Sequence, residues 1–189
     1  MIRSKKILFQ INNKQYIKII IECPDKIFTH RFDPVTILFY DGKKKYILSE
    51  HDHLGPELET LNCFFKASIN GDLELLKTII EDLGYLYNEE IHNRSLKPKK
   101  VAGKGIRYYL MLDGNQNTTW LYTKNNSIFL QITPSYLWHF SDPEEHEPFI
   151  SYDEFIKNYQ SCLTVEIKKE TMENWAIQSN EILQMIKDE

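Results

Sequence analysis

The stretch Thr119-Trp-Leu-Tyr-Thr-Lys-Asn-Asn-Ser-Ile-Phe-Leu-Gln-Ile-Thr133 decides the fold, because it holds two strand-forming runs joined by a short polar turn. In the second run, Ile128, Leu130 and Ile132 alternate with other residues, as in a sheet that has one wetter face. A third run, Ile106–Leu112, comes before them across a polar turn that contains Asp-Gly. The pattern predicts an antiparallel meander in the middle of the chain.

The first fifty residues are also predicted to form strands. Lys5–Ile11 and Gln15–Glu22 flank Asn-Asn-Lys, a sequence suited to a tight turn. Val35–Tyr40 and Lys44–Leu48 meet across Asp-Gly, a strong hairpin signal. The pattern leaves open whether residues 1–50 join the main sheet or form a β-rich subdomain beside an α+β main domain of residues 51–189.

Helical spacing appears between the hairpins and the meander. Apolar residues from Leu58 to Ile69 recur every three or four positions and predict a helix that ends at Asn70-Gly71. Asp72 is placed to cap a second helix, whose apolar residues Leu73, Leu76, Ile79, Ile80 and Leu83 lead to its end at Gly84. These two helices would form a helical hairpin.

The C-terminal part is predicted to be mainly helical. Ser151 and Glu154 form a capping box for a helix that runs to Tyr159. Leu163–Ile167 is a candidate short strand, and Thr171 is placed to cap a last amphipathic helix. We therefore expect an α+β fold with antiparallel β hairpins, a helical hairpin, an antiparallel β meander and two C-terminal helices.

The composition disfavours membrane insertion and export. The longest apolar run, Tyr16–Ile21, has six residues and is interrupted by Lys18, whereas a membrane-spanning helix needs about 20 apolar residues. The first ten residues become polar too early for a signal peptide. We expect a cytoplasmic protein with no membrane partner.

The net charge of −4 hides an uneven distribution. Arg94–Arg107 holds six basic residues and no acidic one. Ser141-Asp-Pro-Glu-Glu-His-Glu-Pro148 holds four carboxylates and two prolines, which predicts an exposed loop. The carboxylates of this loop are either simply solvated or attract a cationic partner.

The basic segment could also indicate nucleic-acid binding, but the composition disfavours this interpretation. The chain has only four arginines, the side chain best suited to bidentate contacts with bases and phosphates. Its 19 lysines and 23 isoleucines fit the codon bias of an AT-rich genome. We expect no nucleic-acid partner.

Catalytic and cofactor motifs are scarce in the sequence. There is no Gly-x-Ser-x-Gly elbow, and the three cysteines form no Cys-x-x-Cys pair, so we predict no catalytic residue and no cofactor. The one metal-like cluster combines two imidazoles and two carboxylates, from His51, Asp52, His53 and Glu57. This cluster is either a polar turn or the divalent-metal site of a hydrolase.

Aromatic residues around the meander suggest a binding surface. Tyr and Trp often anchor protein interfaces, and one sheet face could not bury all of those present. The interface candidates are the aromatic residues Trp120, Tyr122, Tyr136 and Trp138 and the loop carboxylates Asp142, Glu144, Glu145 and Glu147.

Three segments of the sequence carry a resemblance to a known group of proteins. Trp120–Phe140, Phe149–Tyr159 and Thr171–Ala176 hold a Trp/Tyr-rich strand pair, a Ser-Tyr-x-Glu-Phe helix and a closing helix that bears a tryptophan. Together they resemble the C-terminal part of small bacterial immunity proteins, which neutralise polymorphic or contact-dependent-inhibition toxins. The resemblance covers about seventy of the 189 residues. It implies a non-catalytic protein that binds a cognate protein toxin stoichiometrically.

Overall fold

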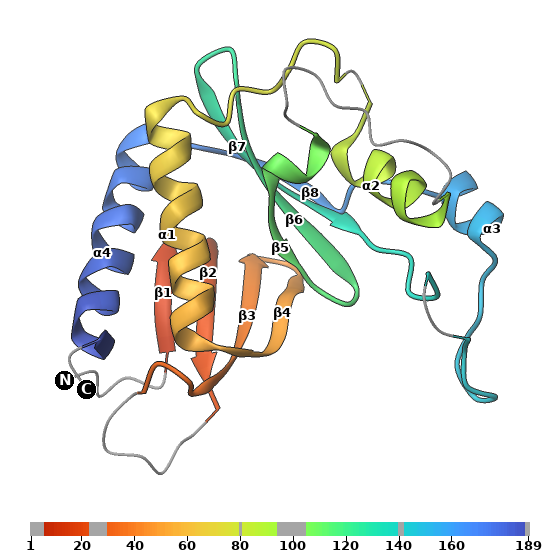
Figure 1. Ribbon diagram of the computed structural model, residues 1–189, viewed down its shortest axis with the longest axis horizontal. Helices are drawn as coiled ribbons and strands as arrows, with labels where there is room; N and C mark the ends of the chain where they lie inside the picture. Colours follow the sequence, from red (N-terminus) through yellow and green to blue (C-terminus); the bar gives the residue numbers. More distant parts are fainter. Residues whose placement is uncertain (1–5, 23–29, 80, 94–104, 140–141, 188–189) are drawn as a thin grey trace.

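The computed structural model of the chain describes residues 6–22, 30–79, 81–93, 105–139 and 142–187. It shows a mixed α+β protein with two four-stranded antiparallel sheets, which confirms the predicted fold class (Figure 1). Most of the basic segment predicted from the sequence, residues 94–104, lies outside the described residues, as does Cys23.

The N-terminal sheet contains the first four strands in sequential order. These strands are β1 (Lys6–Gln10), β2 (Gln15–Ile21), β3 (Pro34–Asp41) and β4 (Lys45–His53). Both predicted hairpins are confirmed, and alternation sends Ile17, Ile19 and Ile21 of β2 into the core. The expected boundary at residue 50 falls inside β4, which leads directly into helix α1 (Leu54–Asn70).

The C-terminal sheet is the predicted meander, extended by one strand from later in the chain. Its strands are β5 (Leu110–Asp113), β6 (Asn117–Lys124), β7 (Ser127–Pro134) and β8 (Leu163–Ile167). The predicted strand Ile106–Leu112 is only partly correct, because its first four residues form the short 3-10 helix η1 (Ile106–Tyr109). Asn125 and Asn126 make the turn between β6 and β7 with φ of 52° and 66°, a backbone region that asparagine tolerates. The short strand expected at residues 163–167 is confirmed.

Helices α1 and α4 (Lys169–Lys187) pack side by side next to the N-terminal sheet (Figure 1). The buried Asn62 amide of α1 donates to Ala176 O at 2.9 Å and to Ser179 Oγ at 2.7 Å in α4. Helix α4 also reaches the outer edge of β1, where Trp175 Nε1 donates to Gln10 O and Gln178 Nε2 donates to Leu8 O.

The position predicted for the second helix of the helical hairpin is wrong, because the helix begins later in the chain. Residues 72–79 form turns and a short extended segment, and α2 (Leu83–His92) begins near the residue where the predicted helix was to end. The backbone of Leu73–Leu75 bonds to Thr123 of β6, and this tertiary pairing overrides the local helical spacing. Asp82, and not Asp72, caps the helix, with Oδ1 accepting from Tyr85 N. Ile80 lies outside the described residues.

Helix α3 (Tyr152–Lys157) follows a long segment after β7 and is shorter than predicted. Its predicted cap is confirmed, because Ser151 Oγ accepts from Glu154 N at 3.2 Å. The two sheets share one continuous hydrophobic core, to which Leu48 of β4, Leu58 of α1 and Leu121 of β6 all belong. Helix α3 and the segment before it extend away from this core, at the right of Figure 1.

Candidate functional site

The four candidate metal ligands lie around the β4–α1 junction and do not form a metal site. His51 has an 83% exposed side chain beside Glu22, and His53 Nδ1 lies 3.0 Å from Phe32 O. Asp52 accepts a hydrogen bond from the Ser49 hydroxyl, and its carboxylate lies close enough to Glu57 to act on the pKa of that group. Within the described part of the chain, no group of three or more His, Cys, Asp or Glu side chains could hold a metal ion. The hydrolase alternative therefore has no support from the geometry.

One of these four residues, Glu57, nevertheless has a strongly shifted pKa. Burial, followed by the nearby Asp52 carboxylate and its hydrogen bond, raises the pKa of Glu57 to about 7. Glu57 Oε2 is buried and has no hydrogen-bond partner among the described residues. Near neutral pH, Glu57 is therefore partly protonated.

Glu57→Gln should remove a pH dependence of stability. Between pH 4.5 and about 7, folded Glu57 binds more protons than unfolded Glu57, so the stability of the natural chain falls as the pH rises through this range. Glutamine cannot ionise, and E57Q should exceed the natural chain by about 2 kcal/mol at pH 8, with little gain at pH 5. Urea unfolding from pH 5 to 8 measures this difference. Glu59→Gln, two residues further along α1, should keep the natural slope. Equal slopes for E57Q and the natural chain would contradict the prediction.

Two of the four aromatic interface candidates are buried in this structure. Trp120 is 0% exposed and donates its Nε1 hydrogen to the hydroxyls of Thr118 and Thr133. Its ring packs edge-on against Tyr87 of α2 at 5.5 Å. The period-two pattern of β6 could not reveal that α2 covers this face of the strand, so Trp120 is corrected from an interface candidate to a core residue. Tyr136 is also buried.

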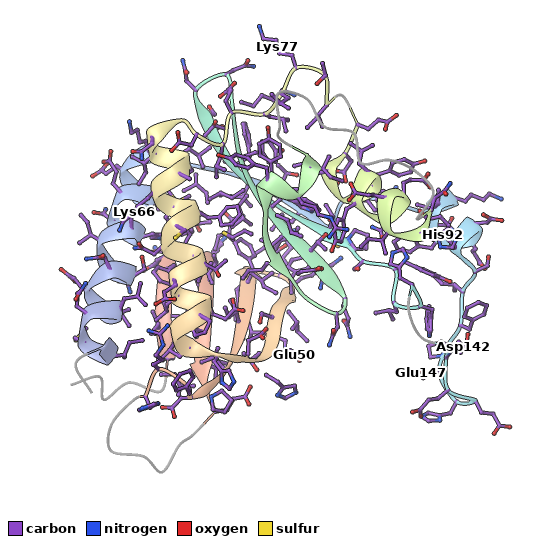
Figure 2. All side chains as sticks on the ribbon, in the orientation of Figure 1. Glu50, Lys66, Lys77, His92, Asp142 and Glu147 are labelled. Atoms are coloured by element: carbon purple, nitrogen blue, oxygen red, sulfur yellow. The ribbon has the colours of Figure 1, made fainter. Side chains whose placement is uncertain are left out.

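The segment between β7 and α3 carries all of the other candidates except Tyr122, and we call residues 137–139 and 142–151 of this segment the docking arm. Figure 2 shows Asp142 and Glu147 on it, well away from the two sheets. Asp142, Glu144, Glu145 and Glu147 are all exposed, as the sequence predicts. Trp138 is half-buried on the same arm, whereas the half-buried Tyr122 lies on β6 and stacks with Phe129.

The docking arm also exposes apolar side chains that the sequence interpretation missed. Leu137 is 47% exposed, Phe149 is 56% exposed and Ile150 is 38% exposed. They are three of the eight large apolar side chains that are exposed among the described residues. Their place beside a carboxylate-rich loop could have been noticed in the sequence, because Phe149-Ile150 directly follows Pro148.

Aromatic contacts hold the base of the docking arm together. Tyr136 lies at their centre, with ring contacts to Trp138, His139, Tyr152 and Phe155. Its hydroxyl donates to Ile150 O at 3.1 Å, and Trp138 meets Phe149 edge-on at 5.5 Å. These contacts tie the outgoing and returning halves of the arm to each other, so Phe149 is held in place while its ring stays exposed.

The acidic turn at the far end of the docking arm is also ordered by local hydrogen bonds. Glu147 N donates to Glu144 O at 3.0 Å, and Glu144 N donates to a carboxylate oxygen of Glu147 at 2.9 Å. His146 lies 3.5 Å from Glu144 and is 81% exposed. The turn therefore presents several carboxylates to solvent at one place.

Helix α2 holds the other side of the base. His92 stacks on Tyr152 of α3, with ring centroids 3.5 Å apart and an angle of 8° between the rings. The Tyr152 hydroxyl donates to Glu89 at 3.0 Å, and burial, followed by this hydrogen bond, raises the pKa of Tyr152. Sequence reasoning missed Glu89 and His92, because nothing in the sequence of α2 indicates that these polar side chains contact Tyr152.

Asp82 joins this region to the C-terminal sheet. Its carboxylate accepts hydrogen bonds from Tyr159, Ser161 and Gln131, in addition to the helix-capping bond. Burial, followed by the hydrogen bond to Asp82, raises the pKa of Tyr159. With several donors satisfied, Asp82 is a structural anchor that fixes α2 against the segment after α3.

Comparison of the chain with models of protein families, with curated proteins and with solved structures finds no match. Within the described residues, none of the helices has the length and apolar character needed to cross a bilayer.

Proposed function

We propose that this chain is a non-catalytic binding protein, an immunity protein that neutralises a cognate, cationic protein toxin in the cytoplasm. The observation that carries the proposal is the docking arm, where exposed Phe149, Ile150 and Leu137 accompany four exposed carboxylates. Aromatic anchors ringed by charge are typical of specific protein interfaces. The resemblance of the C-terminal segments to bacterial immunity proteins supports the same function.

The two kinds of side chain have different roles in the proposed complex. The carboxylates attract a basic surface over a distance and raise the association rate. The apolar side chains lose their contact with water in the complex and slow its dissociation. A toxin that acts on nucleic acid would present the required basic surface, because it must bind phosphates.

The test uses the toxin encoded beside this gene, with its catalytic residue inactivated, and measures binding kinetics. The natural chain should bind it with one-to-one stoichiometry. A variant carrying Asp142→Asn, Glu144→Gln, Glu145→Gln and Glu147→Gln should associate about tenfold to a hundredfold more slowly at low salt, and its rate should depend less on salt.

A matched control removes the same number of exposed carboxylates elsewhere: Glu50→Gln, Glu170→Gln, Glu173→Gln and Glu181→Gln. The control should associate much faster than the docking-arm variant. An equal loss in both variants would assign the effect to net charge and not to the docking arm. A toxin that does not bind the natural chain would reject the proposed function.

A further inference from the structure

Asn88 of α2 is fully buried, although asparagine is a polar residue with four hydrogen-bonding positions. Its Nδ2 group donates to Gly84 O at 2.8 Å and to Pro134 O, at the end of β7, at 3.0 Å. Its Oδ1 accepts from Tyr136 N at 2.8 Å and lies 3.1 Å from His139 Nε2. One side chain therefore binds its own helix and three successive points on the chain that leads into the docking arm.

The chemistry of these contacts requires an amide at this position. Burial, followed by the nearby His92, lowers the pKa of His139 to about 4, so the imidazole is neutral at pH 7. Because Asn88 Oδ1 can only accept, His139 Nε2 carries the hydrogen. Aspartate at position 88 would lose the two donated bonds, and alanine would lose all four.

The same helix also holds Tyr152, the residue that directly follows the returning half of the docking arm. Glu89 accepts from the Tyr152 hydroxyl, and His92, one turn after Asn88, stacks on the Tyr152 ring. Outgoing and returning halves are thus both fixed to α2 within about one helical turn. The Asn88 amide contacts the backbone of the chain just before the docking arm, at Pro134 and Tyr136, and the side chain of His139 at the start of the arm.

We propose that Asn88 is the positioning residue of the binding surface: it fixes the direction of the docking arm, so the partner meets Phe149 and the carboxylates already in place. This inference rests on the proposed function. It implies a protein partner with a basic surface around an apolar recess, which complements the exposed carboxylates and Phe149, and a preformed docking arm lowers the ordering cost of binding that partner.

The effect on affinity follows from the fraction of molecules whose docking arm points in the binding direction. If loss of the Asn88 contacts reduces that fraction to about one tenth, the apparent Kd rises about tenfold. The interface residues themselves are unchanged, so the loss should fall mainly on the association rate, with the dissociation rate within about twofold of natural.

The experiment compares the natural chain, Asn88→Asp, Asn88→Ala and the control Asn70→Ala, which changes an exposed asparagine at the end of α1. Hydrogen exchange reports on the backbone from Tyr136, whose amide donates to Asn88, to residue 150, and on strands β1–β3 as a measure of the intact body. In the Asn88 variants, exchange of the arm should rise at least tenfold while β1–β3 stay protected. Asn70→Ala should match the natural chain. Asn88→Asp preserves the side-chain size and serves as the second variant if Asn88→Ala does not fold.

Binding to the inactivated toxin separates the inference from the proposed function. A slower association of the Asn88 variants, with a nearly natural dissociation rate, supports the positioning role. An unchanged arm exchange, or a loosened arm that binds at the natural rate, overturns it. If the toxin ignores even the natural chain, the proposed function fails, while the exchange data still decide whether Asn88 orders the arm.

Discussion

Gly84→Ala should lower the free energy of unfolding by about 3 kcal/mol, although alanine is the better helix former by about 1 kcal/mol. A Cβ atom at Gly84 would lie 2.0 Å from Thr133 Oγ1 and 2.5 Å from the Tyr159 hydroxyl. Neither neighbour can yield easily, because Thr133 bonds to Thr118 and Trp120, and Tyr159 bonds to Asp82. Helix α2 would have to move off β7, and this would also disturb Asn88.

Urea unfolding followed by tryptophan fluorescence measures this loss, and Trp120 beneath α2 should report on it directly. Gly71→Ala is the matched control. Gly71 has a φ of 80° but no atom within 4 Å of the added methyl group, so only backbone strain of about 1 kcal/mol is expected there. If G84A is as stable as the natural chain, α2 does not pack closely on β7.

Phe149→Ala should weaken binding of the inactivated toxin by about thirtyfold or more, which corresponds to about 2 kcal/mol. An aromatic anchor that loses its contact with water in a complex contributes strongly, whereas removal of an exposed ring costs little in the free protein. The 56% exposure of Phe149 means that its truncation should leave the free energy of unfolding nearly unchanged. Most of the loss should appear as faster dissociation.

Calorimetry or surface-based kinetics gives the affinity, and urea unfolding gives the stability. Ile177→Ala is the control, because Ile177 is 58% exposed on α4, away from the docking arm. Ile177→Ala should bind as the natural chain does. A natural affinity for Phe149→Ala would move the interface away from the docking arm and remove the main argument for it.

The strands and turns were predictable because their signals are local. Alternating apolar residues, Asp-Gly at Asp41 and the Asn125-Asn126 pair specify hairpins with little help from the rest of the chain. The Ser151 cap and the exposure of the acidic loop were predictable for the same reason. Proline and charged residues affect mainly the conformation and solvent exposure of the residues next to them.

The predictions that failed have one cause in common: contacts between residues that are far apart in the sequence. The helical spacing after Asp72 was misleading because the backbone of Leu73 and Leu75 pairs with Thr123, about fifty residues away. The exposure of Trp120 depended on which sheet face α2 covers. Asn88 carries no local sign of its role, since its contacts at Pro134, Tyr136 and His139 lie 46 to 51 positions along the chain.

The hydrogen bonds from α4 to the outer edge of β1 have a consequence for folding during synthesis. Gln178 and Trp175 occupy carbonyl groups of Leu8 and Gln10, so two elements more than 160 positions apart complete the same sheet edge. During synthesis, β1 emerges from the ribosome well before α4, so its outer edge stays uncovered until α4 has also been made. Until then its open edge could pair with another nascent strand, and such exposed edges are sites of aggregation. We therefore expect efficient production of this protein to depend on how quickly α4 follows β1 during synthesis.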